Sequence, residues 1–124
     1  MGEKCTTSSV RRISLVVSLC SLTVFGPAAA AAGDAAKGGT VYTANCMACH
    51  GVNADGKGPA AAAFQPKPTD FTSATFWMDR KDDGIKAVVR TGRPGTPMMP
   101  FGKLSEADLD NLVAFLRTKA PAGG

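Results

Sequence analysis

The sequence predicts an all-α domain of four or five short helices from its patterning, and its composition predicts that this domain needs additional stabilisation. No stretch of residues 33–124 alternates apolar and polar residues as a half-buried strand does. Residues 105–116 place apolar side chains at helical spacing behind a capping signal. Leu, Ile, Val and Phe number only 15 of the 92 residues in 33–124. Such a small core usually needs a disulfide, a metal or a cofactor.

The first 32 residues have the three-part order of a secretory signal peptide. Residues 1–12 are polar and basic, residues 13–25 are apolar, and a run of small alanines follows. An uncleaved anchor is the alternative, but the apolar run is shorter than the roughly 20 residues that span a bilayer. We therefore expect cleavage near Ala30–Ala32, export to the periplasm, and a mature domain, 33–124, that does not span the membrane.

Length and charge exclude several classes of protein. The 124 residues suffice for one domain, which excludes a multi-domain enzyme. The formal charge is +4 for the whole chain and +2 for residues 33–124, with no run of basic residues. We therefore expect no nucleic acid among the partners.

The first helix is predicted over residues 34–45. Asp34 is a favourable N-cap residue, and apolar or small residues recur on one helical face. Gly38 and its neighbour Gly39 each weaken a helix by roughly 1 kcal/mol relative to alanine. A helix that retains them is expected to let another backbone approach closely.

The middle of the chain predicts short elements. Residues 60–64 allow a turn or two of helix before two prolines, and another turn begins at Asp70. Residues 79–91 predict a helix that ends at Gly92. The apolar positions of this helix are Ile85, Val88 and Val89.

Residues 92–102 are rich in glycine and proline and predict a loop. Ser105 and Asp108 then form a near capping box, with Asp in place of the usual Glu. The helix behind it has the clearest apolar stripe of the chain: Leu109, Leu112, Val113 and Leu116.

Cys46-Met-Ala-Cys49-His50 has the spacing that attaches a c-type haem. Two thiols three residues apart can each add to a vinyl group of one porphyrin, and His50 then follows where its imidazole can reach the iron. The motif predicts one haem c, held covalently by Cys46 and Cys49.

Three other interpretations compete. A disulfide between the two cysteines would suit an oxidising compartment. A thioredoxin-like pair would need a βαβ pattern, which is missing from the sequence. A zinc site would need a fourth ligand, yet His50 is the only histidine of the chain.

The second axial ligand of the iron must come from another residue type, because a second histidine does not exist. Met98 and Met99 lie in the Gly- and Pro-rich loop about 50 residues further on. A thioether ligand favours ferrous iron and raises the reduction potential. Either methionine could also be an ordinary apolar filler.

With these motifs, the chain resembles the class I c-type cytochromes of the small bacterial kind. The resemblance covers residues 33–119 and rests on these segments: 33–42, 46–51, 58–59 with 66–72, 95–98 and 104–116. It implies the cytochrome c fold, in which the first and last helices cross. Gly38 would let Leu112 and Phe115 approach, with Tyr42 packed against them.

The resemblance also implies roles for single residues. A loop proline usually offers its carbonyl to the ligand histidine, and Pro59 is the candidate. Trp77 is placed near a haem propionate, with an ordinary core position as the alternative. Counting from Gly95-Thr96 or back from Phe101 selects Met98 as the ligand, whereas the Met-Pro dipeptide selects Met99.

Three functions follow from these residues. The first is a soluble one-electron carrier, not an enzyme, with His50 and Met98 as axial ligands and transient redox protein partners, working as a monomer. The second is a haem-c electron-entry subunit of a larger oxidoreductase. The third is a haem sensor or enzyme with a labile methionine, for which the sequence offers few acid or base groups.

Overall fold

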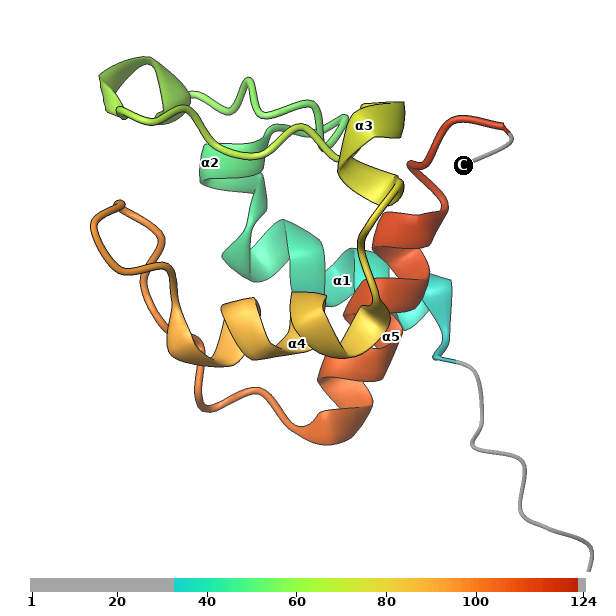
Figure 1. Cartoon of the computed structure of the whole chain (residues 1–124). Helices are drawn as coiled ribbons and strands as arrows, with labels where there is room; N and C mark the ends of the chain where they lie inside the picture. Colours follow the sequence, from blue (N-terminus) through green and yellow to red (C-terminus); the bar gives the residue numbers. More distant parts are fainter. Residues whose placement is uncertain (1–32, 123–124) are drawn as a thin grey trace, which may run out of the picture.

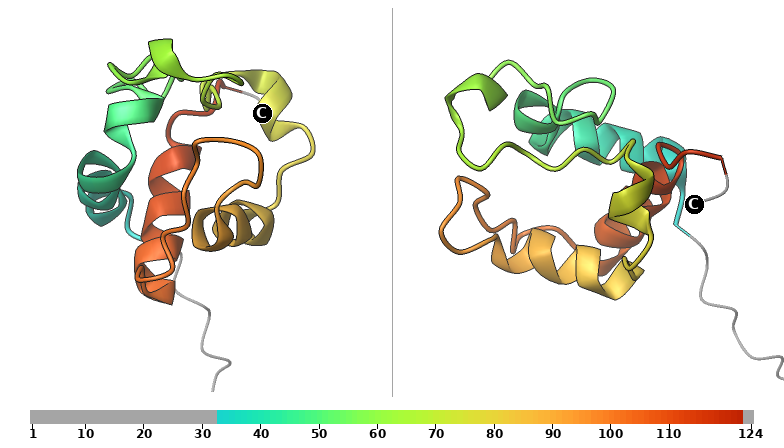
Figure 2. Two further views of the ribbon diagram at one scale, coloured as in Figure 1. Left: turned by 90° about the vertical axis from the view of Figure 1, so that its left-hand side faces the viewer. Right: turned by 45° about the horizontal axis from the view of Figure 1, so that its top comes forward.

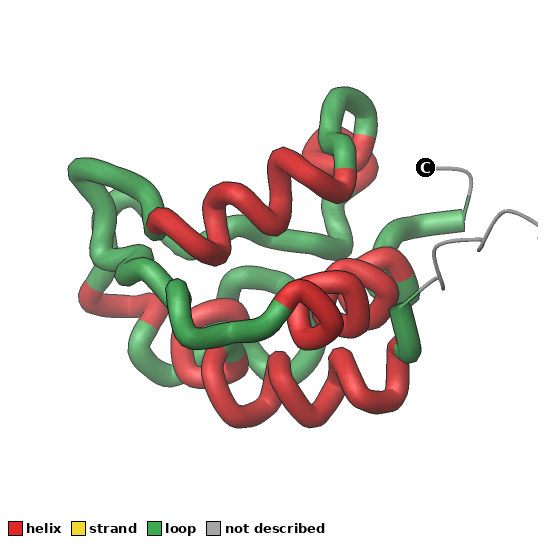
Figure 3. The backbone as a smooth tube through the Cα atoms, turned by 90° about the horizontal axis from the view of Figure 1, so that it is seen from below, coloured by secondary structure: helices red, strands yellow, loops and turns green. Residues whose placement is uncertain are grey.

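The computed structural model describes residues 33–122, so the predicted signal peptide lies outside the described residues. Within this range the chain forms helices and loops and no strand, as Figures 1 and 3 show, which confirms the all-α prediction. The elements in chain order are α1 (Ala35–Asn45), α2 (Met47–His50), a 3-10 turn (Ala61–Ala63), α3 (Ala74–Trp77), α4 (Asp82–Thr91) and α5 (Glu106–Arg117).

Helix α1 begins where the sequence predicts. The Asp34 side chain accepts hydrogen bonds from the backbone N–H groups of Ala36 and Lys37, which would otherwise have no partner within the helix. The Asp34 N–H itself donates to the side chain of Asn111 on α5. The start of α1 is therefore tied to the helix that it crosses.

Helices α1 and α5 cross, as Figure 1 shows. Gly38 lies where the two backbones come closest to each other. A Cβ atom at Gly38 would collide with the backbone carbonyl of Asn111 and would lie 2.8 Å from the Cβ of Phe115. The rings of Tyr42 and Phe115 pack with their centroids 5.0 Å apart. The crossing and the Phe115 approach are confirmed, whereas the backbone nearest to Gly38 is that of Asn111 rather than Leu112.

Helix α5 has the complete predicted capping box. The Ser105 hydroxyl accepts from the Asp108 N–H, and the Asp108 carboxylate accepts from the Ser105 N–H. All four residues of the apolar stripe are buried: Leu109, Leu112, Val113 and Leu116. This helix therefore carries much of the core.

Helix α4 begins at Asp82, three residues later than predicted. Arg80 lies outside the helix, and its carbonyl accepts a hydrogen bond from Arg117 of α5. Gly92 ends the helix with φ of 69°, a conformation that glycine adopts readily. Of the apolar positions of this helix, Ile85 and Val89 are buried, whereas Val88 is 39% exposed and borders a cavity.

Two long loops extend from the helices on the same side of the molecule, as the right-hand view of Figure 2 shows. Residues 51–73 form the upper loop in that view, and residues 92–104, named here the methionine loop, form the lower one. The side chains on the facing sides of these loops line the cavity that contains the candidate site.

Candidate functional site

A cavity of about 560 Å³ lies between the two loops, with α4 and α5 at its base. Its lining is mostly apolar and includes Phe64, Phe71, Ile85, Val89, Phe101 and Leu112. Both cysteines of the Cys-x-x-Cys-His motif, its histidine and both candidate methionines also line it. The fold therefore brings Cys46 and Met98, which lie far apart in the sequence, to one site.

The motif lies on α2, the single helical turn Met47–His50, with Cys46 just before it. The two thiols are free and half-buried. Burial, with the nearby Cys49, raises the pKa of the Cys46 thiol to about 11. Both thiols and His50 face one cavity from one turn of chain, which is the arrangement that two thioether bonds to a single porphyrin require.

His50 is held by a backbone carbonyl of the upper loop. Its Nδ1 lies 3.0 Å from the Thr69 carbonyl oxygen. A carbonyl only accepts, so Nδ1 carries the hydrogen and Nε2 keeps its lone pair for a metal. Burial lowers the pKa of His50, and the bond to Thr69 partly opposes that shift. The imidazole is therefore already in the tautomer that an iron ligand needs.

The prediction that Pro59 supplies this carbonyl is wrong. Pro59 is exposed. Its neighbours are bonded to the backbone of α2, since the Gly58 N–H donates to the Cys49 carbonyl and the Ala60 N–H to the Ala48 carbonyl. These bonds hold Pro59 beside the helix, and the chain reaches the imidazole ten residues later.

The proposed contact of Trp77 with a haem propionate is also corrected. Trp77 is 5% exposed and is not among the residues that line the cavity. Its indole N–H donates to the Phe71 carbonyl over 2.7 Å, so its one polar group already has a partner. Trp77 is thus a core residue, as the alternative interpretation stated.

The methionine loop closes the opposite side of the cavity. Met98 is half-buried, whereas Met99 is 64% exposed, although both border the cavity. The Met98 backbone is fixed at both polar groups: its N–H donates to Thr96 Oγ1 and its carbonyl accepts from the Arg93 N–H. Phe101 lines the cavity, and its N–H donates to the Val89 carbonyl. Met98 is therefore the more buried of the two methionines.

Three cationic side chains line the cavity: Lys67, Arg80 and Arg93. Among residues 33–122, no carboxylate belongs to the lining. A haem carries two propionates, so this charge pattern complements the group that the motif predicts. The thiols, the imidazole with a free Nε2, the thioether and the apolar walls form a donor set for haem c. The residues present therefore fit a haem.

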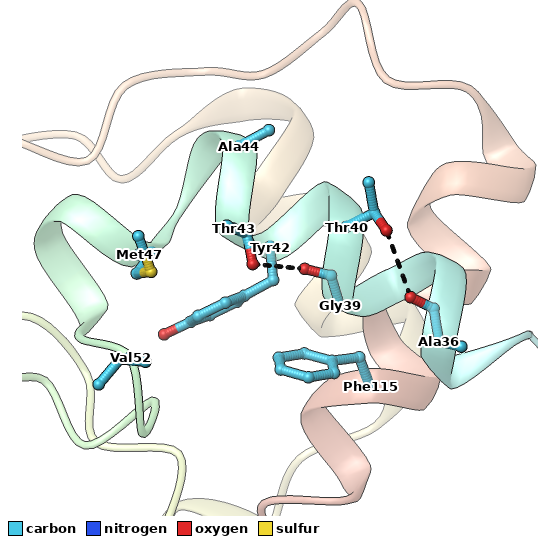
Figure 4. Close-up of a pocket in the computed structure, with 9 residues that line it drawn as sticks. All are labelled: Ala36, Gly39, Thr40, Tyr42, Thr43, Ala44, Met47, Val52 and Phe115. Carbon is cyan, nitrogen blue, oxygen red and sulfur yellow. Dashed lines mark hydrogen bonds between the residues drawn. The ribbon is translucent and has the colours of Figure 1, made fainter.

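A second hollow lies on the outer side of α1 and is shown in Figure 4. It is wide and open, and Tyr42, Met47, Val52 and Phe115 contribute its larger side chains. The hydroxyls of its residues have backbone partners: Thr40 and Thr43 donate to carbonyls of α1, and Tyr42 donates to Gly51. This surface thus lacks a polar group aimed at a ligand.

Comparison with known proteins identifies the class. The cytochrome c family model matches residues 35–120, which contain both loops and all five α-helices described above. The chain therefore belongs to the cytochrome c family, and its cofactor is a haem c attached through Cys46 and Cys49.

Particular relatives support this membership. The chain is 36% identical to cytochrome c-554(547) of Halothiobacillus neapolitanus over 94 residues, which cover 70% of this chain and 98% of the relative. It is 34% identical to a cytochrome c6 of Picosynechococcus over 114 residues, or 87% and 91% of the two chains.

A solved structure is also similar. A chain of the reducing HAO-like protein complex of Kuenenia stuttgartiensis aligns with a TM-score of 0.59 and 25% identity, over 68% of this chain. The alignment spans 41% of that longer chain. Among residues 33–122, no helix combines the length and hydropathy of a membrane span.

Sequence reasoning missed three residues of the site. Thr69 supplies the carbonyl for His50, Phe71 places its ring 4.9 Å from the imidazole, and Arg80 borders the cavity. The sequence indicates residues 66–72 only by two prolines, by a turn that begins at Asp70 and by the family resemblance. The prolines that fix this stretch as extended chain were the available signal, but they do not indicate which carbonyl faces the histidine.

Proposed function

We propose that the protein is a one-electron carrier whose haem iron has His50 and Met98 as axial ligands. One observation carries the proposal: the imidazole of His50 on α2 and the half-buried thioether of Met98 on the methionine loop line the same cavity. With both ligands supplied by the chain, the iron has no open position for a substrate. Oxidation and reduction then need little rearrangement, which suits electron transfer between proteins.

The lining of the cavity supports a carrier more than an enzyme. Within residues 33–122, the ionisable side chains of the lining are the two cysteines, His50 and the three cations. The thiols are consumed by attachment and the histidine by ligation. What remains is not a set of acid and base groups placed for proton transfer.

The absorption spectrum tests the proposed ligands. The ferric protein should show the sulfur-to-iron charge-transfer band, and carbon monoxide should leave the ferrous spectrum unchanged on mixing. A spectrum that carbon monoxide or cyanide changes at once would indicate an open iron position. The sensor or enzyme with a labile methionine would then be favoured.

A second candidate is an electron-entry subunit of a larger oxidoreductase. The specific observation in its favour is the similar chain of the Kuenenia complex, which is longer than this one. Size-exclusion chromatography of the protein from its native cells separates the two. A carrier should elute as a monomer, and a subunit should elute with other chains.

We also propose that the protein works in the periplasm, with residues 1–32 removed near Ala30–Ala32. The three-part order of that segment supports export. The amino-terminal sequence of the mature protein tests this proposal. Redox protein partners should bind transiently.

A further inference from the structure

The buried indole of Trp77 has a contact that electron transfer does not explain. Its N–H donates to the Phe71 carbonyl over 2.7 Å. Phe71 lies two residues after Thr69, whose carbonyl accepts from His50 Nδ1. Trp77 is therefore connected to the candidate iron ligand through the three residues 69–71.

That short segment is fixed on several sides. The Phe71 N–H donates to the Ala54 carbonyl over 2.8 Å, so both backbone groups of Phe71 are bonded. The Phe71 ring packs against the imidazole of His50 on one side and against Phe76, at 5.1 Å, on another. Among these contacts, only the indole N–H holds the Phe71 carbonyl.

The indole ring of Trp77 is itself in contact with a cationic side chain of α5. The guanidinium of Arg117 lies 4.8 Å from the centre of the Trp77 ring. Arg117 also donates to Asp82 over 2.6 Å and 3.0 Å, which fixes the guanidinium between α4 and α5. Phe76 packs edge-on against the indole at 4.9 Å. The position of the N–H donor is thus set by three helices.

We propose that Trp77 is a positioning residue for the axial histidine. It holds the segment 69–71 so that the Thr69 carbonyl remains within hydrogen-bond distance of His50 Nδ1. A strong bond at Nδ1 makes the imidazole a more basic ligand and favours ferric iron. The inference rests on the proposed function, because it requires His50 to bind the iron.

The test removes the indole N–H and retains an aromatic ring. In Trp77→Phe, the segment loses one hydrogen bond and the bond at Nδ1 should weaken. The His50 Nδ1 proton of the ferrous protein should exchange with solvent about tenfold faster, the ratio that corresponds to one lost hydrogen bond. The midpoint potential should rise.

The matched control is Phe115→Leu. The Phe115 ring packs against Tyr42, with the centroids 5.0 Å apart, and Phe115 is not among the described residues that line the cavity. This variant should lower stability and leave proton exchange and potential near the wild-type values. If Trp77→Phe and Phe115→Leu shift the exchange rate and the potential equally, Trp77 is merely a core residue and the proposal fails.

A second substitution guards against misfolding. Trp77 is the single tryptophan of the chain, so growth on a benzothiophene analogue replaces the indole N–H by sulfur at this site alone. The same faster exchange and higher potential are expected, and unchanged values overturn the proposal. If the wild-type protein gives no signal of a histidine bound to iron, the proposed function is contradicted instead. The failure of the proposed function can therefore be told apart from the failure of the role proposed for Trp77.

Discussion

The α1–α5 crossing and the methionine loop are built in opposite ways. At the crossing the two backbones touch at Gly38, and the apolar stripe of α5 is fully buried. The methionine loop is held by single hydrogen bonds, and Met99 is 64% exposed. The difference indicates that the crossing determines the stability of the fold, whereas the methionine loop determines the ligand chemistry. Mutations at the crossing should therefore change the free energy of unfolding and not the haem spectrum, and mutations in the loop should do the reverse.

The largest loss of stability is expected from Gly38→Ala. The added Cβ would collide with the Asn111 carbonyl, which is backbone and cannot turn aside, and would lie 2.8 Å from the Cβ of Phe115. The helices must separate, at a cost of about 3 kcal/mol. Guanidinium unfolding followed by circular dichroism measures the change. The charge-transfer band of the folded fraction should remain.

The neighbouring glycine gives the control. A Cβ at Gly39 would approach only the Phe115 ring edge, at 3.3 Å. Alanine gains about 0.5–1 kcal/mol in a helix, which offsets a small shift of the ring. Gly39→Ala should therefore be close to neutral. Equal effects at both positions would mean that backbone contact does not define the crossing.

Met98→Ala should have the largest effect on the haem spectrum. The half-buried thioether is the proposed ligand, so its removal should abolish the charge-transfer band and lower the potential. Met99→Ala removes an exposed side chain and should retain both properties. Absorption spectra and redox titrations of the ferric variants measure them.

The outcomes of this pair are distinct. If Met99→Ala loses the band and Met98→Ala keeps it, the ligand assignment is reversed. If both variants keep it, the two thioethers replace each other or the ligand lies outside the loop. A Met98→Ala variant that fails to fold would show that the methionine loop also determines the stability of the fold, and would contradict the division of roles between the crossing and the loop.

The sequence predicted the crossing better than the loops, for a physical reason. The capping of α1 by Asp34 and of α5 by Ser105 is local, because each cap lies within three residues of its partner. The apolar stripe of α5 likewise follows from helical periodicity. The carbonyl of Thr69 lies 19 residues from His50, and no periodic pattern connects the two.

The two errors have the same origin. Pro59 was selected by residue type, yet the backbone bonds of Gly58 and Ala60 decide where it lies. The resemblance places Trp77 near a haem propionate, yet its indole N–H donates to the Phe71 carbonyl. Covalent motifs such as Cys46 to His50 can be read from sequence because the chemistry fixes their spacing.

Thr96→Val should loosen the methionine loop without removing the ligand. The Thr96 hydroxyl accepts from the Met98 N–H and donates to the Arg93 carbonyl over 2.8 Å. Without these two hydrogen bonds, external imidazole should displace the thioether more readily. We expect its affinity to rise about tenfold, which corresponds to the net free energy of about one hydrogen bond. Spectral titration of the ferric protein with imidazole measures this affinity.

The control for that variant is Thr43→Val on α1. Thr43 is exposed and, like Thr96, its hydroxyl donates to a backbone carbonyl, that of Gly39 over 2.8 Å. It lies outside the methionine loop, so the imidazole affinity should not change. An equal increase in both variants would show that general stability, rather than the loop, controls access to the iron.

The smallest effect is expected at the junction of the two regions, where the methionine loop ends and α5 begins. The hydroxyl and N–H of Ser105 donate to the Asp108 carboxylate over 2.7 Å and 3.0 Å, and they lower the pKa of Asp108 below its ordinary value of 3.8. Because the pKa of Asp108 falls on folding, the stabilisation is complete above pH about 5 and is lost as the pH falls through the pKa of the folded state.

Asp108→Asn should therefore be less stable than the wild type at neutral pH, and the difference in stability should shrink toward pH about 3. Guanidinium unfolding at a series of pH values measures it, and Ser105→Ala, which removes one of the two donors, should reduce the same pH dependence. A difference that stays constant or widens in acid would contradict the assignment, whereas an unchanged charge-transfer band would place this cap with the crossing rather than with the loop.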